Sequence, residues 1–222
     1  MLLPSNVISL ATFREMLAER FPEAARPVER HWATGWAAID EESGGLKHGT
    51  VTELCGSSAC GRFFLDRVLA SVRQRGSFAG LVDCGKTFDP GSYDAAVLAR
   101  VLTVFCTTTE QSVKVTDLLL RDGNLPLVLL DLQTMAPRQL GRIPMSTWHR
   151  FQRLVEKSGA VLVVLTPQPI VESARIRIVL SAQWDLAELK RPRRELMPGV
   201  AVQIFRRGRQ VAATEEARVQ TA

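Results

Sequence analysis

Short apolar runs alternate along the chain with amphipathic stretches, and this alternation predicts an α/β protein. The runs expected to form strands cover residues 51–54, 78–83, 102–105, 127–131 and 160–165. Between them, apolar side chains recur at helical spacing over residues 63–75, 92–100, 110–121 and 145–157. Strands that alternate with helices predict a mainly parallel, twisted sheet that is flanked by helices and joined by right-handed crossovers.

Both ends of the chain depart from this alternation. Ser9 precedes apolar residues at helical spacing, which predicts a short, capped amphipathic helix before Pro22. Its apolar face comprises Leu10, Phe13, Leu17 and Phe21. Residues 178–189 and 200–206 predict a closing C-terminal β-hairpin. We therefore expect an N-terminal helix and linker over residues 1–32, a core domain over 33–211 and a flexible tail over 212–222.

The composition is that of a globular protein with one domain. Of 222 residues, 46% are hydrophobic and 23% are charged, which excludes a disordered or fibrous chain. Apolar runs stay below the roughly 18 residues that span a bilayer, and residues 1–13 lack the pattern of a secretory signal. We expect a cytoplasmic protein without membrane contact. The four cysteines lack C-x-x-C spacing, which favours buried free thiols and no metal site.

A pair of glycines after the first expected strand carries the clearest candidate chemistry. Residues 56–63 read G-S-S-A-C-G-R-F, so Gly56 and Gly61 fit the phosphate-loop pattern G-x-x-x-x-G-K-[ST]. In that pattern the lysine reaches the phosphates and the hydroxyl ligates Mg²⁺. Arg62 and Phe63 take these two places here. The residues indicate either a phosphate loop without its catalytic side chains or an ordinary turn between strand and helix.

Asp131 ends residues 127–131, the clearest of the expected strands. Nucleotide-hydrolysing folds of this kind carry an acid at such a position, where it holds Mg²⁺ through water. An Asp after a buried strand can equally cap the loop that follows.

Several segments in order resemble the core of the RecA recombinases. Residues 34–49 carry T-G, I-D, G-G-L and G at matching places before the glycine pair. Residues 81–90, L-V-D-C-G-K-T-F-D-P, resemble a recombinase stretch that contains D-A-E-H-A-L-D-P. Residues 162–168 resemble the strand that ends in a γ-phosphate-sensing glutamine, here Gln168. The resemblance covers most of residues 33–211 and implies a RecA-like core.

The resemblance also implies that catalysis has been lost. The glutamate that activates the attacking water in recombinases falls on Gly85, and loss of a general base costs about 10² to 10⁴ in rate. We therefore expect no enzymatic activity and no required cofactor, with weak ATP binding left open. The vestigial nucleotide site would comprise Gly56, Gly61, Arg62, Asp131 and Gln168.

Positive charge is concentrated in the C-terminal part of the chain. Residues 138–209 contain 14 Lys and Arg against five Asp and Glu, within a chain of net charge +5. By resemblance, a first DNA loop would cover residues 133–146, and a short second loop 169–176. A basic face for DNA or an acidic partner is one interpretation, and a solvated arginine-rich surface is the other. The candidate residues are Arg138, Arg142, Arg175, Arg177, Lys190, Arg191, Arg193, Arg194, Arg206, Arg207 and Arg209.

Compact size, the altered loop and the basic C-terminal part make the chain most similar to the ImuA group. This similarity implies an accessory role in bacterial mutagenic translesion synthesis under SOS control, near the nucleoid. The expected partners are RecA or a second copy through the N-terminal helix, an ImuB-type polymerase subunit, and, as a further candidate, single-stranded DNA. Aromatic residues make up only 6%, which argues against a dedicated single-strand binder. The alternatives are a slow DNA-dependent ATPase or recombination mediator, and an SOS inhibitor of cell division.

Overall fold

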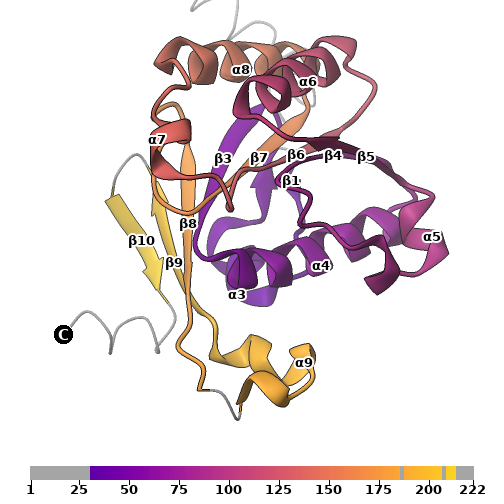
Figure 1. Ribbon diagram of the computed structural model, residues 1–222, viewed down its shortest axis with the longest axis vertical. Helices are drawn as coiled ribbons and strands as arrows, with labels where there is room; N and C mark the ends of the chain where they lie inside the picture. Colours follow the sequence, from indigo (N-terminus) through magenta and orange to yellow (C-terminus); the bar gives the residue numbers. More distant parts are fainter. Residues whose placement is uncertain (1–30, 186–187, 207–208, 214–222) are drawn as a thin grey trace, which may run out of the picture. The chain divides into compact units, whose positions relative to one another are not determined.

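The computed structural model describes residues 31–185, 188–206 and 209–213. Its centre is an eight-stranded sheet with the order β10-β9-β8-β3-β7-β6-β4-β5 (Figure 1). The strands of this sheet are β3 Thr50–Cys55, β4 Ala79–Cys84, β5 Val101–Cys106, β6 Leu127–Asp131, β7 Val161–Thr166, β8 Ile176–Ser181, β9 Ala201–Arg206 and β10 Arg209–Ala213.

The strands β3 to β8 pair in parallel, and the last two strands run antiparallel to their neighbours. This arrangement confirms the expected mainly parallel sheet with a C-terminal hairpin. The first hairpin strand ends earlier than expected, because β8 ends at Ser181 and residues 182–185 do not continue it. The segment between the hairpin strands instead contains the short helices η2 Glu188–Lys190, α9 Arg193–Leu196 and η3 Met197–Gly199.

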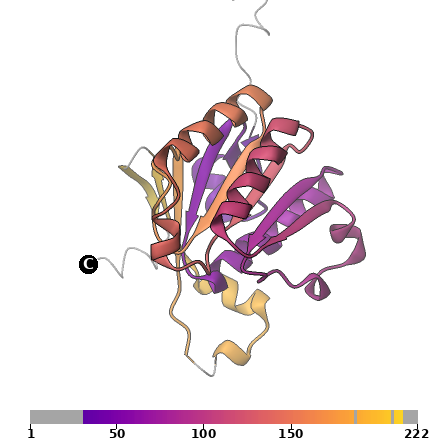
Figure 2. The ribbon, with the colours of Figure 1, turned by 45° about the horizontal axis from the view of Figure 1, so that its top comes forward.

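Helices cover both faces of the sheet. One face carries α3 Ala37–Ser43, α4 Ser58–Gln74 and α5 Ala95–Leu98, and the other carries α6 Thr109–Asp122 and α8 Met145–Ser158 (Figures 1 and 2). The remaining helices are η1 Pro90–Ser92 and α7 Pro137–Leu140, so the helix expected over residues 92–100 is confined to the shorter α5.

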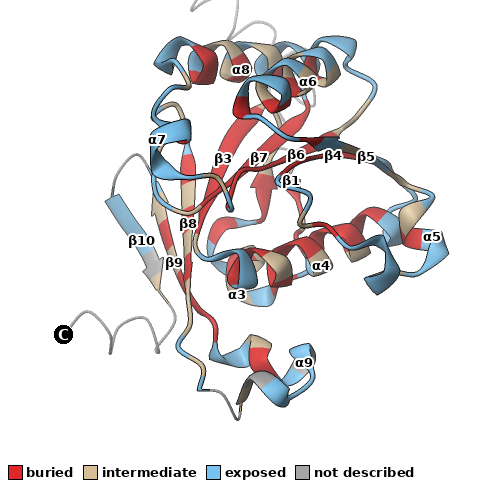
Figure 3. Cartoon of the chain, in the orientation of Figure 1, coloured by how far each residue is buried: buried red, intermediate tan, exposed pale blue. Residues whose placement is uncertain are grey.

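Side chains that alternate along the strands supply both cores. Leu129 of β6 packs in the same core as Phe64 of α4, whereas the next residue, Leu130, packs in the core that contains Phe151 of α8. Successive strand residues point to opposite faces of a sheet, so a continuously apolar strand serves two hydrophobic layers at once. Figure 3 shows the result: the central strands are buried, α6 and α8 each carry buried and exposed residues, and the short α5 and α7 each have only one buried residue.

A small two-stranded sheet opens the described part of the chain. β1 His31–Trp32 pairs antiparallel with β2 Leu46–Lys47. Trp32 is buried, and its indole N–H donates to Ser71 Oγ of α4 at 2.9 Å. Residues 31 and 32, which we had assigned to the linker, therefore pack in the core domain. The expected N-terminal helix, with Leu10, Phe13, Leu17 and Phe21, and residues 214–222 of the tail lie outside the described residues.

Two further findings concern the length and polarity of the helices and the state of the cysteines. Among the described residues, every helix is too short or too polar to cross a bilayer. All four cysteines are buried and free, as expected.

Candidate functional site

The expected phosphate loop is mostly helical. β3 ends at Cys55 and α4 begins at Ser58, so only Gly56 and Ser57 connect strand and helix. The Ser57 side chain caps the helix by accepting from the Cys60 amide at 3.3 Å, and the Gly61 amide donates to the Ser57 carbonyl at 2.9 Å. We had expected the helix to start at residue 63. The capping serine extends the helix by five residues, 58–62, and two amides of the motif, those of Cys60 and Gly61, are bonded to Ser57.

The side chain of Gln133 fills the space beside the glycine pair. Its amide nitrogen donates to the carbonyls of Gly56 and Ser57 at 3.0 and 3.1 Å. A methyl group at Gly61 would lie 1.9 Å from the Gln133 Oε1. Gly61 is therefore required for the close approach of this amide. Gln133 belongs to the segment expected to form the first DNA loop, and the local sequence pattern does not indicate its contact with the loop before α4.

Gly61→Ala tests the fit between Gly61 and Gln133. The new methyl group would displace the Gln133 amide, and we expect the free energy of unfolding to fall by about 1–2 kcal/mol in spite of the better helix propensity of alanine. In a Gln133→Ala background the same change should raise stability by up to about 1 kcal/mol, because only the propensity term remains. Urea unfolding of the four variants measures this coupling; equal effects of Gly61→Ala in both backgrounds would contradict the contact.

Arg62 and Phe63 both turn away from the glycine pair. The Arg62 guanidinium donates to the Thr87 carbonyl in the segment after β4. Phe63 is buried and its ring centroid lies 5.6 Å from that of Trp184. The residue at the place of the phosphate lysine thus holds a neighbouring segment, and the residue at the place of the Mg²⁺ hydroxyl packs in the core.

Asp131 lies beside a second buried carboxyl group. Asp83 of β4 and Asp131 of β6 are register partners at the carboxyl end of the sheet. Asp83 accepts from the Phe88 amide at 2.7 Å, and Asp131 accepts from the Gln133 amide at 3.0 Å. Burial, with a contribution from the negative charge of Asp83, raises the pKa of Asp131 to about 6. Asp131 therefore does cap its following loop, the second of the two roles that its position allows.

Two positions remain, that of the missing catalytic glutamate, Gly85, and the last residue of the expected nucleotide site, Gln168. Gly85 has φ +124°, and a Cβ there would meet the Thr134 Oγ1 at 2.3 Å. A side chain of any kind at this position is strained, which removes room for a general base. Gln168 is exposed in the segment after β7.

A nucleotide with Mg²⁺ does not fit these residues. Gln133 lies against the loop carbonyls, the Cys60 and Gly61 amides are bonded to Ser57, and a phenyl ring replaces the metal-binding hydroxyl. Among the described residues, no group of three or more His, Cys, Asp and Glu side chains is arranged to hold a metal ion.

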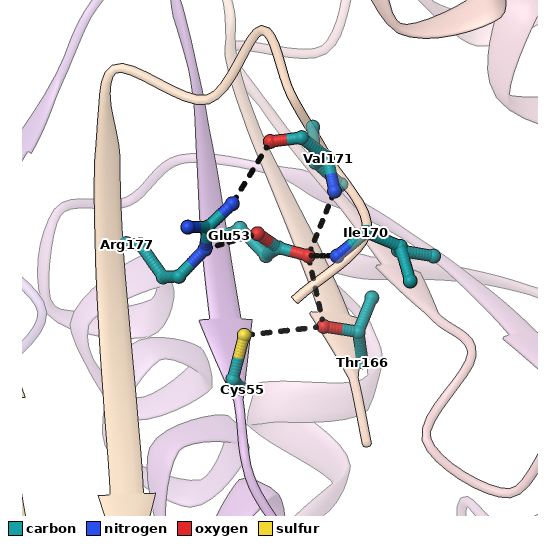
Figure 4. A network of polar contacts seen from close by, with 6 residues as sticks. All are labelled: Glu53, Cys55, Thr166, Ile170, Val171 and Arg177. Atoms are coloured by element: carbon teal, nitrogen blue, oxygen red, sulfur yellow. Dashed lines mark hydrogen bonds and ion pairs between the residues drawn. The ribbon is translucent and has the colours of Figure 1, made fainter. Parts of the chain in front are cut away.

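Arg177 was expected to contact DNA, and the structure corrects this. Arg177 of β8 is the register partner of Glu53 in β3, and its Nε lies 2.6 Å from the Glu53 carboxylate (Figure 4). Glu53 is fully buried and also accepts from Thr166 Oγ1 and the amides of Ile170 and Val171. The guanidinium is thus needed to neutralise a buried carboxylate, and Glu53 fixes the segment that follows β7.

The other basic candidates are mostly at the surface. Arg138, Arg142, Arg175, Lys190 and Arg209 are exposed. Arg206 donates to the Ser43 carbonyl at 3.2 Å. Arg207 and the side chain of Arg194 lie outside the described residues.

The structure brings three of the candidate arginines together. Arg191 and Arg193 of the segment between β8 and β9 share a pocket with Arg62 of α4, although more than 125 residues separate them in the chain. Each of the two also pairs with an acid, Arg191 with Glu195 at 3.5 Å and Arg193 with Asp66 at 3.4 Å. The basic run is therefore folded back on α4 and does not project from a hairpin.

Comparison with known proteins agrees with this architecture. No protein-family model matches the chain. Over 131 residues, 54% of this chain, it is 28% identical to the protein RecA of Clavibacter michiganensis subsp. michiganensis (strain NCPPB 382), and the match spans only about a third of that protein's length, 33%. The crystal structure of the RadB recombinase aligns with a TM-score of 0.61 at 15% identity, covering 84% of this chain and 97% of that chain. The chain is thus similar in sequence to a RecA protein and has the RecA-like fold.

Proposed function

We propose that this chain is a non-hydrolysing RecA-like accessory protein of the bacterial DNA-damage response, and that it serves mutagenic translesion synthesis as members of the ImuA group do. It acts by contact with other proteins, namely RecA or a second copy through its N-terminal segment and an ImuB-type polymerase subunit. It also contacts DNA through basic side chains. The similarity to RecA and to the RadB recombinase supports a role in DNA repair or recombination.

One observation carries the non-hydrolytic part of the proposal: the chain's own groups satisfy the elements that would hold a nucleotide. The Gln133 amide donates to the Gly56 and Ser57 carbonyls and lies against Gly61, Arg62 is bonded to Thr87, and Gly85 has no room for a side chain. Hydrolysis of a phosphate anhydride needs charge stabilisation at the transferred phosphoryl group and a positioned water. These residues supply neither.

ATP turnover tests this part of the proposal. We expect release of phosphate from ATP to stay at the level of buffer alone, with or without single-stranded DNA and Mg²⁺. We also expect Arg62→Lys/Phe63→Thr to restore nothing, because α4 would still begin at Ser58 and Gln133 would still lie beside Gly61. Turnover that requires Mg²⁺, scales with protein and is lost in Arg62→Ala would identify a slow ATPase and refute the proposal.

Affinity purification of this protein from DNA-damaged cells tests the accessory role. A tagged full-length chain should co-purify a RecA-type recombinase or a polymerase of the damage response. Phe13→Asp/Leu17→Asp should lose that partner, whereas Glu15→Gln on the polar side of the same expected helix should keep it. Co-purification of a cell-division protein alone would favour the inhibitor alternative.

A further inference from the structure

A pocket of about 370 Å³ lies between the first turns of α4 and the segment that joins β8 to β9. Its lining has two chemically different parts. Arg62, Arg191 and Arg193 contribute guanidinium groups, and Phe63, Trp184 and Leu196 contribute apolar surface. Among the described residues, no Asp or Glu lines it. The pocket therefore suits a ligand that joins a negative charge to a flat apolar group.

The guanidinium groups of Arg191 and Arg193 are available to an anion, whereas that of Arg62 is bonded to the Thr87 carbonyl. The ion pairs of Arg191 and Arg193 are long, at 3.5 and 3.4 Å, and these two side chains are 55% and 54% exposed. Ion pairs of this kind contribute about 0–1 kcal/mol and exchange readily for a stronger partner. The pocket also takes in the N-terminal turn of α4, a helix of 17 residues without an acid in its first turn, whose dipole adds to the positive potential.

The apolar part contains the one tryptophan that a ligand can reach. Trp32, Trp36 and Trp148 are buried at 3%, 6% and 2% exposure. Trp184 is only partly buried and lies beside the Phe63 ring. An indole at the rim of a cationic pocket is a surface on which a nucleobase can stack.

We propose that this pocket binds one nucleotide unit of single-stranded DNA, with the phosphodiester at the arginines and the base against Trp184. This assignment deepens the DNA contact of the proposed function and rests on it. A phosphodiester carries a single negative charge and needs no metal ion, which suits a site where Phe63 replaces the Mg²⁺-binding hydroxyl. Guanidinium groups bind phosphate oxygens through paired N–H donors.

The surroundings of the pocket favour a strand over a free nucleotide. Arg193 lines both this pocket and a second hollow of about 600 Å³, which continues along α4 past Arg73 and Tyr93. A ligand that follows both hollows is longer than one nucleotide. Asp94 and Asp66 also line this hollow and pair with Arg73 and Arg193 at 3.7 and 3.4 Å, so a neighbouring phosphate would meet these arginines by exchanging with weak ion pairs.

Titration with a fluorescein-labelled oligothymidylate tests the proposal. Anisotropy reports binding, and tryptophan fluorescence reports contact with Trp184. We expect binding with quenching. Arg191→Gln/Arg193→Gln should lower the affinity at least about tenfold and reduce the slope of log K against log salt by about one. Trp184→Leu should abolish the quenching and weaken binding about fivefold or more, with the salt slope unchanged.

The matched control is Arg121→Gln/Arg153→Gln, which removes two charges from α6 and α8 on the opposite face of the sheet. This control variant should bind the oligonucleotide with an affinity within about twofold of the wild type, because the two charges that it lacks lie far from the proposed DNA site. Thermal unfolding of each variant shows whether it is folded.

Every other outcome would overturn the assignment of this pocket, and the outcomes differ in what they imply for the proposed function. Two results would place the DNA elsewhere and leave the DNA contact of the proposed function standing. One is an equal loss of affinity in Arg191→Gln/Arg193→Gln and in the control Arg121→Gln/Arg153→Gln. The other is a loss of affinity in Arg138→Gln/Arg142→Gln only. Displacement of the oligonucleotide by thymidine monophosphate or Mg-ATP at equal phosphate concentration would make a free nucleotide the ligand. No binding by the wild type would refute the DNA contact itself, and leave the protein contacts to the purification test.

Discussion

Replacing Arg177 with methionine is expected to lower the free energy of unfolding by about 3–5 kcal/mol, the usual cost of leaving one charge of a buried pair without its partner. Glu53 is 0% exposed, and Arg177 provides its nearest positive charge at 2.6 Å. The hydrogen bonds from Thr166, Ile170 and Val171 would remain, but amide dipoles do not replace a full positive charge. Urea unfolding at neutral pH measures the difference.

Two variants control this prediction. Glu53→Gln/Arg177→Met removes both charges and should lose much less than the sum of the single changes. Arg191→Met breaks the exposed pair with Glu195 and should cost less than about 1 kcal/mol. If Arg177→Met also stays within about 1 kcal/mol of the wild type, the guanidinium is not what neutralises Glu53, and Arg177 becomes available to DNA again.

The sheet could be predicted from sequence because its strands are covered on both faces. β6 has the same limits in the structure as the apolar run at residues 127–131, and β4 and β7 are displaced from their expected runs by one residue at each end. A strand that is buried on both faces is apolar along its whole length, and this pattern can be recognised without knowing which strand it pairs with. The start of α4 differs from the expected one because the Ser57 side chain caps the helix earlier in the chain.

The role of Arg177 depends on strand register, which the local pattern does not contain. β3 and β8 are neighbours in the sheet although more than a hundred residues separate them, and their register places Glu53 opposite Arg177. A glutamate inside an apolar strand was the available signal, since a buried carboxylate requires a partner. Only the folded structure shows which arginine pairs with Glu53. The contact of Gln133 with the glycine pair likewise cannot be read from the sequence.

Asp131→Asn is expected to stabilise the protein at alkaline pH and to change little at acid pH. Burial raises the pKa of Asp131 from its ordinary 3.8 to about 6, so the folded state holds this proton more tightly than the unfolded state does. Stability from the protonated carboxyl is complete below pH 4 and is lost as pH rises through about 6. One pKa unit corresponds to about 1.4 kcal/mol, so the ionised group costs the folded wild type about 3 kcal/mol at pH 8.

Asparagine has no charge to bury and can still accept from the Gln133 amide. Urea unfolding of both proteins from pH 4 to pH 8 should therefore give curves that coincide at the acid end and separate by about 2–3 kcal/mol at the alkaline end. Asp89→Asn is the control with the opposite sign, because hydrogen bonds from Ser92 and Gly91 lower the pKa of that exposed carboxyl and its stabilisation grows as pH rises. A less stable Asp131→Asn at pH 8 would show that a cation, with Arg62 the nearest candidate, compensates the buried carboxylate.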